Sequence, residues 1–243
     1  MTNKPDTQFE SGIHFLAKNG LNLFASLPIQ SLPTLLQRQL VENQIPIHDF
    51  THLIMTGHGG HLFWAKLQAQ GLMIDDPVDQ FSLQLTQQFI ATYLHSPNYL
   101  ILYPLTSFIV PLTQLGEFAN WSHPAPIGQG INPKFGVWFA YRTAFLVNGR
   151  FPTSTQPATE SPCLSCHEKP CISACPSGAI SQTAFNIFTC TDYRIEVHSS
   201  CADRCLARMA CPVAPEHKYS LPQIQYHYTQ SLETIKAYKR GEL

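Results

Sequence analysis

The distribution of cysteine is the feature that most constrains this chain of 243 residues. The first 162 residues contain no cysteine, and all eight cysteines lie between Cys163 and Cys211. They form two groups, Cys163-x2-Cys166-x4-Cys171-x3-Cys175-Pro and, after Cys190, Cys201-x3-Cys205-x5-Cys211-Pro. Such crowding predicts a site that needs several thiols at once, built on the last third of the chain.

Three kinds of thiol chemistry fit eight cysteines. Disulfides require an oxidising compartment, and the start, MTNKPDTQFESG, lacks the charged-then-apolar layout of a secretory signal. We therefore expect a cytoplasmic protein. Structural zinc sites use similar local spacings, but usually in two clean C-x2-C pairs. A tight run that ends in Cys-Pro is typical of bacterial ferredoxins, whose fourth cysteine binds the other cluster. We favour two [4Fe-4S] clusters, with zinc and disulfides as alternatives.

A crossed division of the thiols suits two clusters. A cubane needs four thiolates from different directions, and one short loop reaches three corners more easily than four. The first set, called here the Cys163 set, consists of Cys163, Cys166, Cys171 and Cys211. The second, the Cys190 set, consists of Cys190, Cys201, Cys205 and Cys175. Eight thiolates suffice for both clusters, so we do not expect His167 or His198 to be ligands.

The cysteine region also carries four basic side chains that need an interpretation. Charged residues are mostly solvated, so we interpret these as ordinary surface charge. The alternative is that some of them offset the negative charge of the clusters and tune their potentials. The four are Lys169, Arg194, Arg204 and Arg208.

The rest of the chain alternates between helical and strand-like patterns. Apolar runs at 21–27, 51–57, 99–104 and 135–148 predict strands, and the segments between them predict helices, one of them capped by Ser31. This favours a mixed α/β (α+β) fold with helices covering a sheet. Pro, Ser and Thr are frequent at 148–162 and indicate a linker. We therefore predict a domain over 1–155, a cysteine-rich domain over 156–218, and a C-terminal helix over 219–243 that packs back.

Charge and hydropathy exclude two kinds of partner. Lys and Arg number 15 and Asp and Glu 16, which leaves no basic excess to neutralise nucleic-acid phosphates. The longest apolar runs fall short of the roughly 18 residues that would suggest a transmembrane helix. We expect neither nucleic acid nor membrane as a partner.

Two segments resemble a known family. CTDYRIE at 190–196 resembles the C-I-S-Y-L-T-I-E segment of epoxyqueuosine reductases, and INPKFGVW at 131–138 resembles their INPEYGSW. The segment beginning at Asn132 is also similar to a stretch of the vitamin B12-processing protein of the methylmalonic aciduria C type. Resemblance to the superfamily of epoxyqueuosine reductases and reductive dehalogenases implies a nitroreductase-like, corrinoid-binding N-terminal domain followed by a dicluster ferredoxin-like module. It also implies cobalamin as a cofactor, and a flavodoxin or ferredoxin as electron donor.

One departure from the family limits what the resemblance implies. Epoxyqueuosine reductases carry an Asp-Ser-x-Pro segment whose Asp is the proposed proton donor, and the matching position here is Phe108. Phenylalanine cannot donate a proton, so we predict a relative with different chemistry, an oxidoreductase acting on a small molecule of unknown identity. The alternatives are a ferredoxin-like electron carrier without a corrinoid and a cobalamin-processing or trafficking protein.

Outside the cysteines, two segments supply candidate site residues. The turn TGHGGHLFWAKL follows a predicted strand, and glycines allow the backbone to approach a phosphate, although we favour a plain turn, in which glycine merely permits a bend. In the long strand, Tyr141 is a candidate acid and Arg142 a candidate holder of a carboxylate or phosphate. The candidates for contact with a corrinoid or nucleotide are His58, Gly59, Gly60, His61, Asn132, Lys134 and Trp138.

Overall fold

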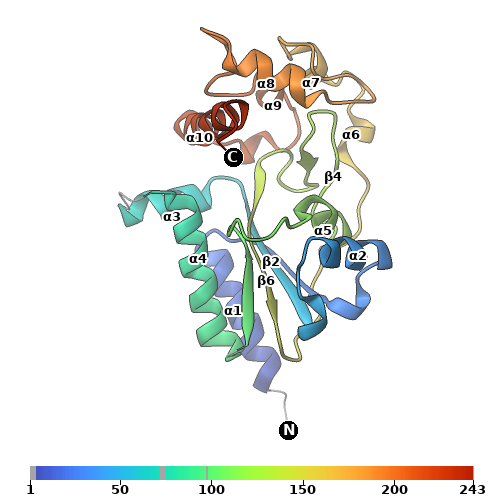
Figure 1. Ribbon diagram of the computed structural model, residues 1–243, viewed down its shortest axis with the longest axis vertical. Coiled ribbons are helices and arrows are strands. Elements are labelled where there is room, and N and C mark those ends of the chain that lie inside the picture. The colour runs from blue at the N-terminus through green and yellow to red at the C-terminus, as the bar shows by residue number, and fades with distance from the viewer. Residues whose placement is uncertain (1–3, 72–74, 97, 243) are drawn as a thin grey trace. The chain divides into compact units, whose positions relative to one another are not determined.

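The computed structural model describes residues 4–71, 75–96 and 98–242 (Figure 1). The chain divides into two compact units. The sheet unit comprises residues 1–122 and 139–159, and the cysteine unit comprises residues 123–138 and 160–243. The sequence led us to place boundaries after residues 155 and 218, whereas in this division the segment 123–138 groups with the cysteines and residues 219–243 belong to the same unit. In the described part of the chain, no helix is both long and apolar enough to cross a membrane.

A four-stranded antiparallel sheet forms the centre of the sheet unit. Its order is β1-β2-β6-β3, so the two strands in the middle are β2 and β6. Side chains of β2 are buried along the whole strand, and those of β6 along most of it. This agrees with the apolar runs that predicted the strands, because a central strand covered on both faces shows no polar alternation. The strands are β1 (Leu23–Pro28), β2 (His52–Gly59), β3 (Tyr99–Tyr103) and β6 (Phe139–Val147).

Helices cover this sheet. Helix α1 packs against α4 and the π-helical turn η3, and Figure 1 shows α1 and α4 side by side. The predicted cap Ser31 is wrong: Ser31 lies in the 3-10 turn η1, its hydroxyl donates to the Pro28 carbonyl, and Pro33 takes the cap position of α2. The helical elements are α1 (Lys4–Lys18), η1 (Ile29–Ser31), α2 (Thr34–Glu42), η2 (Ile47–Asp49), α3 (Leu62–Gln70), α4 (Pro77–Phe89), η3 (Ile90–Leu94) and α5 (Leu112–Phe118).

The cysteine unit is built from short elements. Its described strands, β4 (His123–Pro124) and β5 (Gly130–Ile131), pair with each other only. The one long helix, α10 (Leu221–Lys239), packs against α8 and starts where the Ser220 side chain accepts a hydrogen bond from the Gln223 amide. The remaining elements are α6 (Pro162–Ser165), α7 (Pro170–Ser173), α8 (Ile187–Ile195), α9 (Leu206–Met209) and η4 (Pro215–His217).

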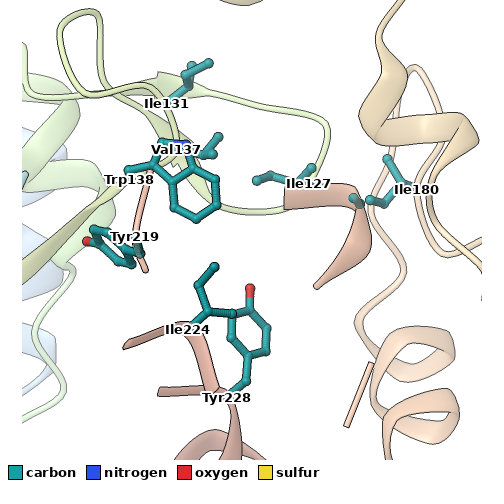
Figure 2. Packing of buried hydrophobic residues seen from close by; sticks show 9 residues of the cluster. Ile127, Ile131, Val137, Trp138, Ile180, Tyr219, Ile224 and Tyr228 are labelled. Carbon is teal, nitrogen blue, oxygen red and sulfur yellow. The ribbon is translucent and has the colours of Figure 1, made fainter. Parts of the chain in front are cut away.

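The core of the cysteine unit joins the segment 123–138 to the C-terminal helix. Figure 2 shows Trp138 beside Tyr219, with Ile224 and Tyr228 of α10 below them. Five cysteines, one of them Cys175, pack against the edge of this apolar cluster. Gly136 has φ +58, and a Cβ there would overlap the Val213 carbonyl, so only glycine fits this close approach. The thiols therefore sit on a core to which 123–138 contributes.

Candidate metal centre

One cavity brings together cysteines from both sequence groups. Its volume is about 320 Å³, and Cys175 lines it together with Cys190, Cys201 and Cys205. Cys175 belongs to the first sequence group and the other three to the second. The cavity wall also carries Arg194, which we interpreted from the sequence as surface charge, and Tyr228, which the sequence analysis did not single out.

The remaining four thiols influence one another. Burial and the neighbouring thiols Cys211 and Cys166 raise the pKa of Cys163. Burial and the thiols Cys211, Cys163 and Cys166 raise the pKa of Cys171. Helices α7 and α9 are separated in the sequence by α8 but pack together, which brings the segments of Cys171 and Cys211 into contact. Cys211 therefore lies close enough to Cys163 and Cys171 to affect the pKa of both thiols.

Electrostatics differ within the Cys190 set. Burial, followed by the thiols of Cys205, Cys175 and Cys201, raises the pKa of Cys190 to about 11. Burial alone would raise the pKa of Cys175 too, but hydrogen bonds from the Ser177 hydroxyl and from backbone amides of residues 179, 177 and 180 lower it. The Ser177 oxygen lies 3.3 Å from the Cys175 sulfur. The pKa of Cys175 is thus lowered, whereas that of Cys190 is raised.

The donor set fits an iron–sulfur cluster. All eight cysteines lie in the described residues and are free thiols, so no disulfide competes for them. Four thiols around one cavity are the ligands that a [4Fe-4S] cluster requires. In the described ranges, no three His, Cys, Asp or Glu side chains are grouped closely enough to hold a single metal ion. His167 and His198, which we did not expect to be ligands, are exposed.

Two of the four basic residues near the thiols are buried, contrary to the surface charge we expected. Arg194 and Arg208 expose 7% and 8% of their area. Arg204 is partly exposed and forms an ion pair of 2.6 Å with Asp203. The sequence could not reveal this burial, because the two guanidinium groups donate hydrogen bonds to acceptors on distant segments. For Arg208 the acceptor is the Val137 carbonyl.

The glycine turn lies in the sheet unit and is largely internal. His58 is fully buried, its ring stacks on Phe63 at 4.9 Å, and its Nδ1 accepts a hydrogen bond of 2.9 Å from the Arg142 Nε. Asn22 holds Gly59 through both backbone groups, at 2.7 and 3.0 Å. Gly60 has φ +73 and is buried, whereas His61 is exposed at the start of α3. Of the two histidines, only His61 is open to a ligand.

Tyr141 and Arg142 are neighbours in β6, but their side chains have different surroundings. The pairing of β2 with β6 shifts between Thr56 and Gly57, which leaves Arg142 as the extra residue of a bulge. Bulges re-aim side chains. The guanidinium of Arg142 lies over the Phe63 ring of α3, 5.6 Å from its centre. The hydroxyl of the neighbouring Thr143 lies 3.0 Å from the Thr86 hydroxyl of α4.

Tyr141 faces a different set of residues. Its ring stacks on Trp121 at 5.8 Å, its hydroxyl oxygen lies 3.1 Å from that of Ser122, and it covers Gly116 of α5. Burial raises its pKa, with Glu117 adding to the effect and the Ser122 hydrogen bond opposing it. The two candidate catalytic side chains are therefore not brought together on one group.

The remaining candidates lie in the cysteine unit. The Asn132 side chain accepts hydrogen bonds from the amides of Lys134 and Phe135, at 2.9 and 2.8 Å, and so shapes a turn. Lys134 is exposed and lies over the Phe135 ring at 5.1 Å. Trp138 is fully buried in the core of Figure 2. The turn explains why β6 begins at Phe139, not at residue 135 as expected.

Comparison with known proteins finds similar folds only among solved structures. No family model matches the sequence, and no curated protein matches it. Among solved structures, the fold is similar to that of epoxyqueuosine reductases. The enzyme from Bacillus subtilis is 12% identical, with a TM-score of 0.60 over 91% of this chain and 69% of that one. An epoxyqueuosine reductase crystallised with a tRNA-Tyr epoxyqueuosine-modified stem loop gives 12% identity, a TM-score of 0.59 and the same coverage.

A third structure, the B12-trafficking protein CblC from C. elegans, is 12% identical over 96% of this chain and 97% of that one. Its TM-score of 0.47 supports no inference. At these identities the likeness to epoxyqueuosine reductases concerns the fold alone.

Proposed function

We propose that this protein is an oxidoreductase that holds two [4Fe-4S] clusters and passes electrons to the sheet unit. The observation that carries the proposal is that Cys175 shares a cavity with three thiols of the other sequence group. A ferredoxin-type pair of clusters requires that exchange, because the cysteine before the proline binds the other cluster. When bound, the clusters would supply one-electron chemistry.

The residues would have separate tasks in this function. The two thiol sets would bind the clusters, and the apolar core of Trp138, Tyr219 and Tyr228 would keep water from them. Ser177 would donate to the sulfur of Cys175. We expect a flavodoxin or ferredoxin as electron donor and an unidentified small molecule as acceptor.

The test is the metal content of anaerobically purified protein. We expect about eight irons and a similar amount of sulfide per chain, since two cubanes carry about four irons each. Colourless protein with stoichiometric zinc would contradict the proposal. Chains in which all four cysteines of the Cys190 set are replaced by serine provide the matched control, which should keep about half of the iron.

A corrinoid in the sheet unit is the second part of the proposal, and it rests on resemblance. Two observations favour the alternative, an electron carrier without a corrinoid. The Nδ1 of buried His58 already accepts a hydrogen bond from Arg142, and the Asn22 side chain is hydrogen-bonded to both the amide and the carbonyl of Gly59. Titration with cobalamins decides between them. A saturable spectral shift supports the corrinoid, and turnover of a second substrate then separates an enzyme from a trafficking protein.

A further inference from the structure

Among the residues that the structure describes, two buried guanidinium groups of the cysteine unit have no carboxylate partner. Arg194 of α8 and Arg208 of α9 are more than nine-tenths buried. Within the described ranges, neither forms an ion pair with Asp or Glu, and one of the two acidic residues nearest in sequence to Arg194, Asp192, pairs with Lys239 instead. A buried charge is normally compensated, because leaving water costs it several kcal/mol. Something other than a protein carboxylate is expected to balance these two charges.

Arg194 lies in the wall of the cavity that the Cys190 set lines. Its Nε donates to the Cys201 carbonyl at 3.1 Å, and its two Nη atoms donate to the Tyr228 carbonyl at 2.8 Å and to the Ser231 hydroxyl at 3.0 Å. The guanidinium also lies over the Tyr228 ring at 5.0 Å. All these partners are neutral, so they fix the group in place beside the thiols without cancelling its charge.

Arg208 has a different position. Its helix, α9, lies between Cys205 of one set and Cys211 of the other, and its backbone amide donates to the Cys205 sulfur at 3.4 Å. Its guanidinium donates to the Val137 carbonyl at 2.7 and 3.1 Å and lies over the rings of Trp138 and Tyr219. Because Arg208 flanks a ligand of each set, its charge acts on both.

We propose that Arg194 is the counterion of a cluster held by the Cys190 set and makes that cluster the one with the higher reduction potential. The inference rests on the proposed function. A positive charge in a water-poor site favours the reduced form, which carries one more negative charge. The hydroxyl of Ser177 beside the Cys175 sulfur acts in the same direction, since hydrogen bonds to sulfur raise the potential. Near the Cys163 set the corresponding charge is Lys169, which is partly exposed and screened by water. Electrons would therefore collect at the Cys190 set.

The test is a redox titration of the anaerobically reconstituted full chain, followed by EPR spectroscopy. In wild-type protein we expect two separate one-electron steps. Arg194→Gln should lower the higher potential by at least a tenfold change in the reduction equilibrium, about 59 mV for one electron, and leave the other unchanged. Arg208→Gln should lower both. Arg204→Gln is the matched control: this arginine lines the same cavity, but its charge is paired with Asp203, and we expect no shift.

Iron content separates the possible failures. Wild-type protein that takes up no iron overturns the proposed function and this inference with it. Wild-type protein with about eight irons, in which Arg194→Gln shifts the potentials no more than Arg204→Gln does, overturns the inference alone. If Arg194→Gln fails to bind the cluster, Arg194→Lys decides. Restored iron in the lysine variant supports a role for charge, whereas equal loss means that the hydrogen bonds to Cys201 and Tyr228 matter instead, and the inference is overturned.

Discussion

The sheet unit contains a four-stranded sheet whose central strands are buried along most of their length, whereas the described strands of the cysteine unit have two residues each. The sheet unit also links its strands and helices through side chains, as in the hydroxyl contacts of Thr143 with Thr56 at 2.7 Å and with Thr86 at 3.0 Å. In the cysteine unit, several side chains at the core edge are thiols, and two buried arginines have no carboxylate partner among the described residues.

This contrast indicates that the two units depend on metal to different degrees. A sheet with a continuous apolar interior is stable without a ligand, since burial of apolar area supplies the driving force. A unit of short helices around free thiols gains part of its folding free energy from metal binding, as small metal-binding domains generally do. The predictions below test this difference.

The largest effect is expected from removing the metal. In the iron-free chain, peptides from α7, α8 and α9 should exchange amide hydrogens at least tenfold faster than in the iron-loaded chain, because local unfolding then costs less free energy. Peptides from β2 and β6 should exchange at the same rate in both. Hydrogen exchange followed by mass spectrometry measures this. Equal acceleration in both units, or none in either, would show that the contrast is wrong.

Pairs of cysteine substitutions test the division of the thiols. Cys175→Ser with Cys190→Ser removes two ligands of one set, so about four irons should remain. Cys175→Ser with Cys171→Ser removes neighbours in sequence that belong to different sets, so almost no iron should remain. Iron and sulfide analysis of the two double variants, purified in parallel, provides the measurement. The opposite ranking would mean that each sequence group binds its own cluster.

Ligand spacing is a local property, so the sequence alone was enough to propose the two thiol sets; the structure places Cys175, Cys190, Cys201 and Cys205 around one cavity, and the division into two cluster sites stays a prediction. The antiparallel order of the sheet was not predicted, since apolar runs locate strands but do not give their partners. The late start of β6 was predictable in principle. An Asn-Pro pair favours a turn, and Asn132 forms one here.

Other features depend on contacts between distant segments. The bulge that aims Arg142 at His58 arises from the pairing of β2 with β6. Likewise, Arg194 and Arg208 have the sequence context of surface charges, and their burial follows from packing against α10 and residues 137–138. Such features are where sequence reasoning about the site failed.

Within the sheet unit, substitution of Gly116 tests how tightly α5 packs against Tyr141 of β6. A Cβ at this position would overlap the Tyr141 hydroxyl, so Gly116→Ala should lower the free energy of unfolding by about 1–3 kcal/mol, although alanine usually favours a helix. Tyr141→Phe removes the oxygen in the way, and the cost of Gly116→Ala should be smaller in that background. Urea unfolding of the four chains of this double-mutant cycle gives the coupling. Equal costs in both backgrounds would contradict the predicted overlap.

The smallest effect is a pH dependence confined to the sheet unit. Burial lowers the pKa of His52 below its usual value of 6.5, with a backbone hydrogen bond at Phe151 opposing the shift. The unfolded chain then binds a proton more readily than the folded chain, so stability is complete above the usual histidine pKa and falls as the pH drops through the range below it. His52→Phe keeps a ring against Phe151, which lies 5.3 Å away, and should flatten this slope. Urea unfolding from pH 5 to 8, followed by hydrogen exchange of β2 and β6 peptides, measures this pH dependence of stability. Replacement of the exposed His61 is the control for the loss of an imidazole. An unchanged slope in His52→Phe would exclude His52 as its source, and a similar slope in peptides of the cysteine unit would show that the pH dependence is not specific to the sheet.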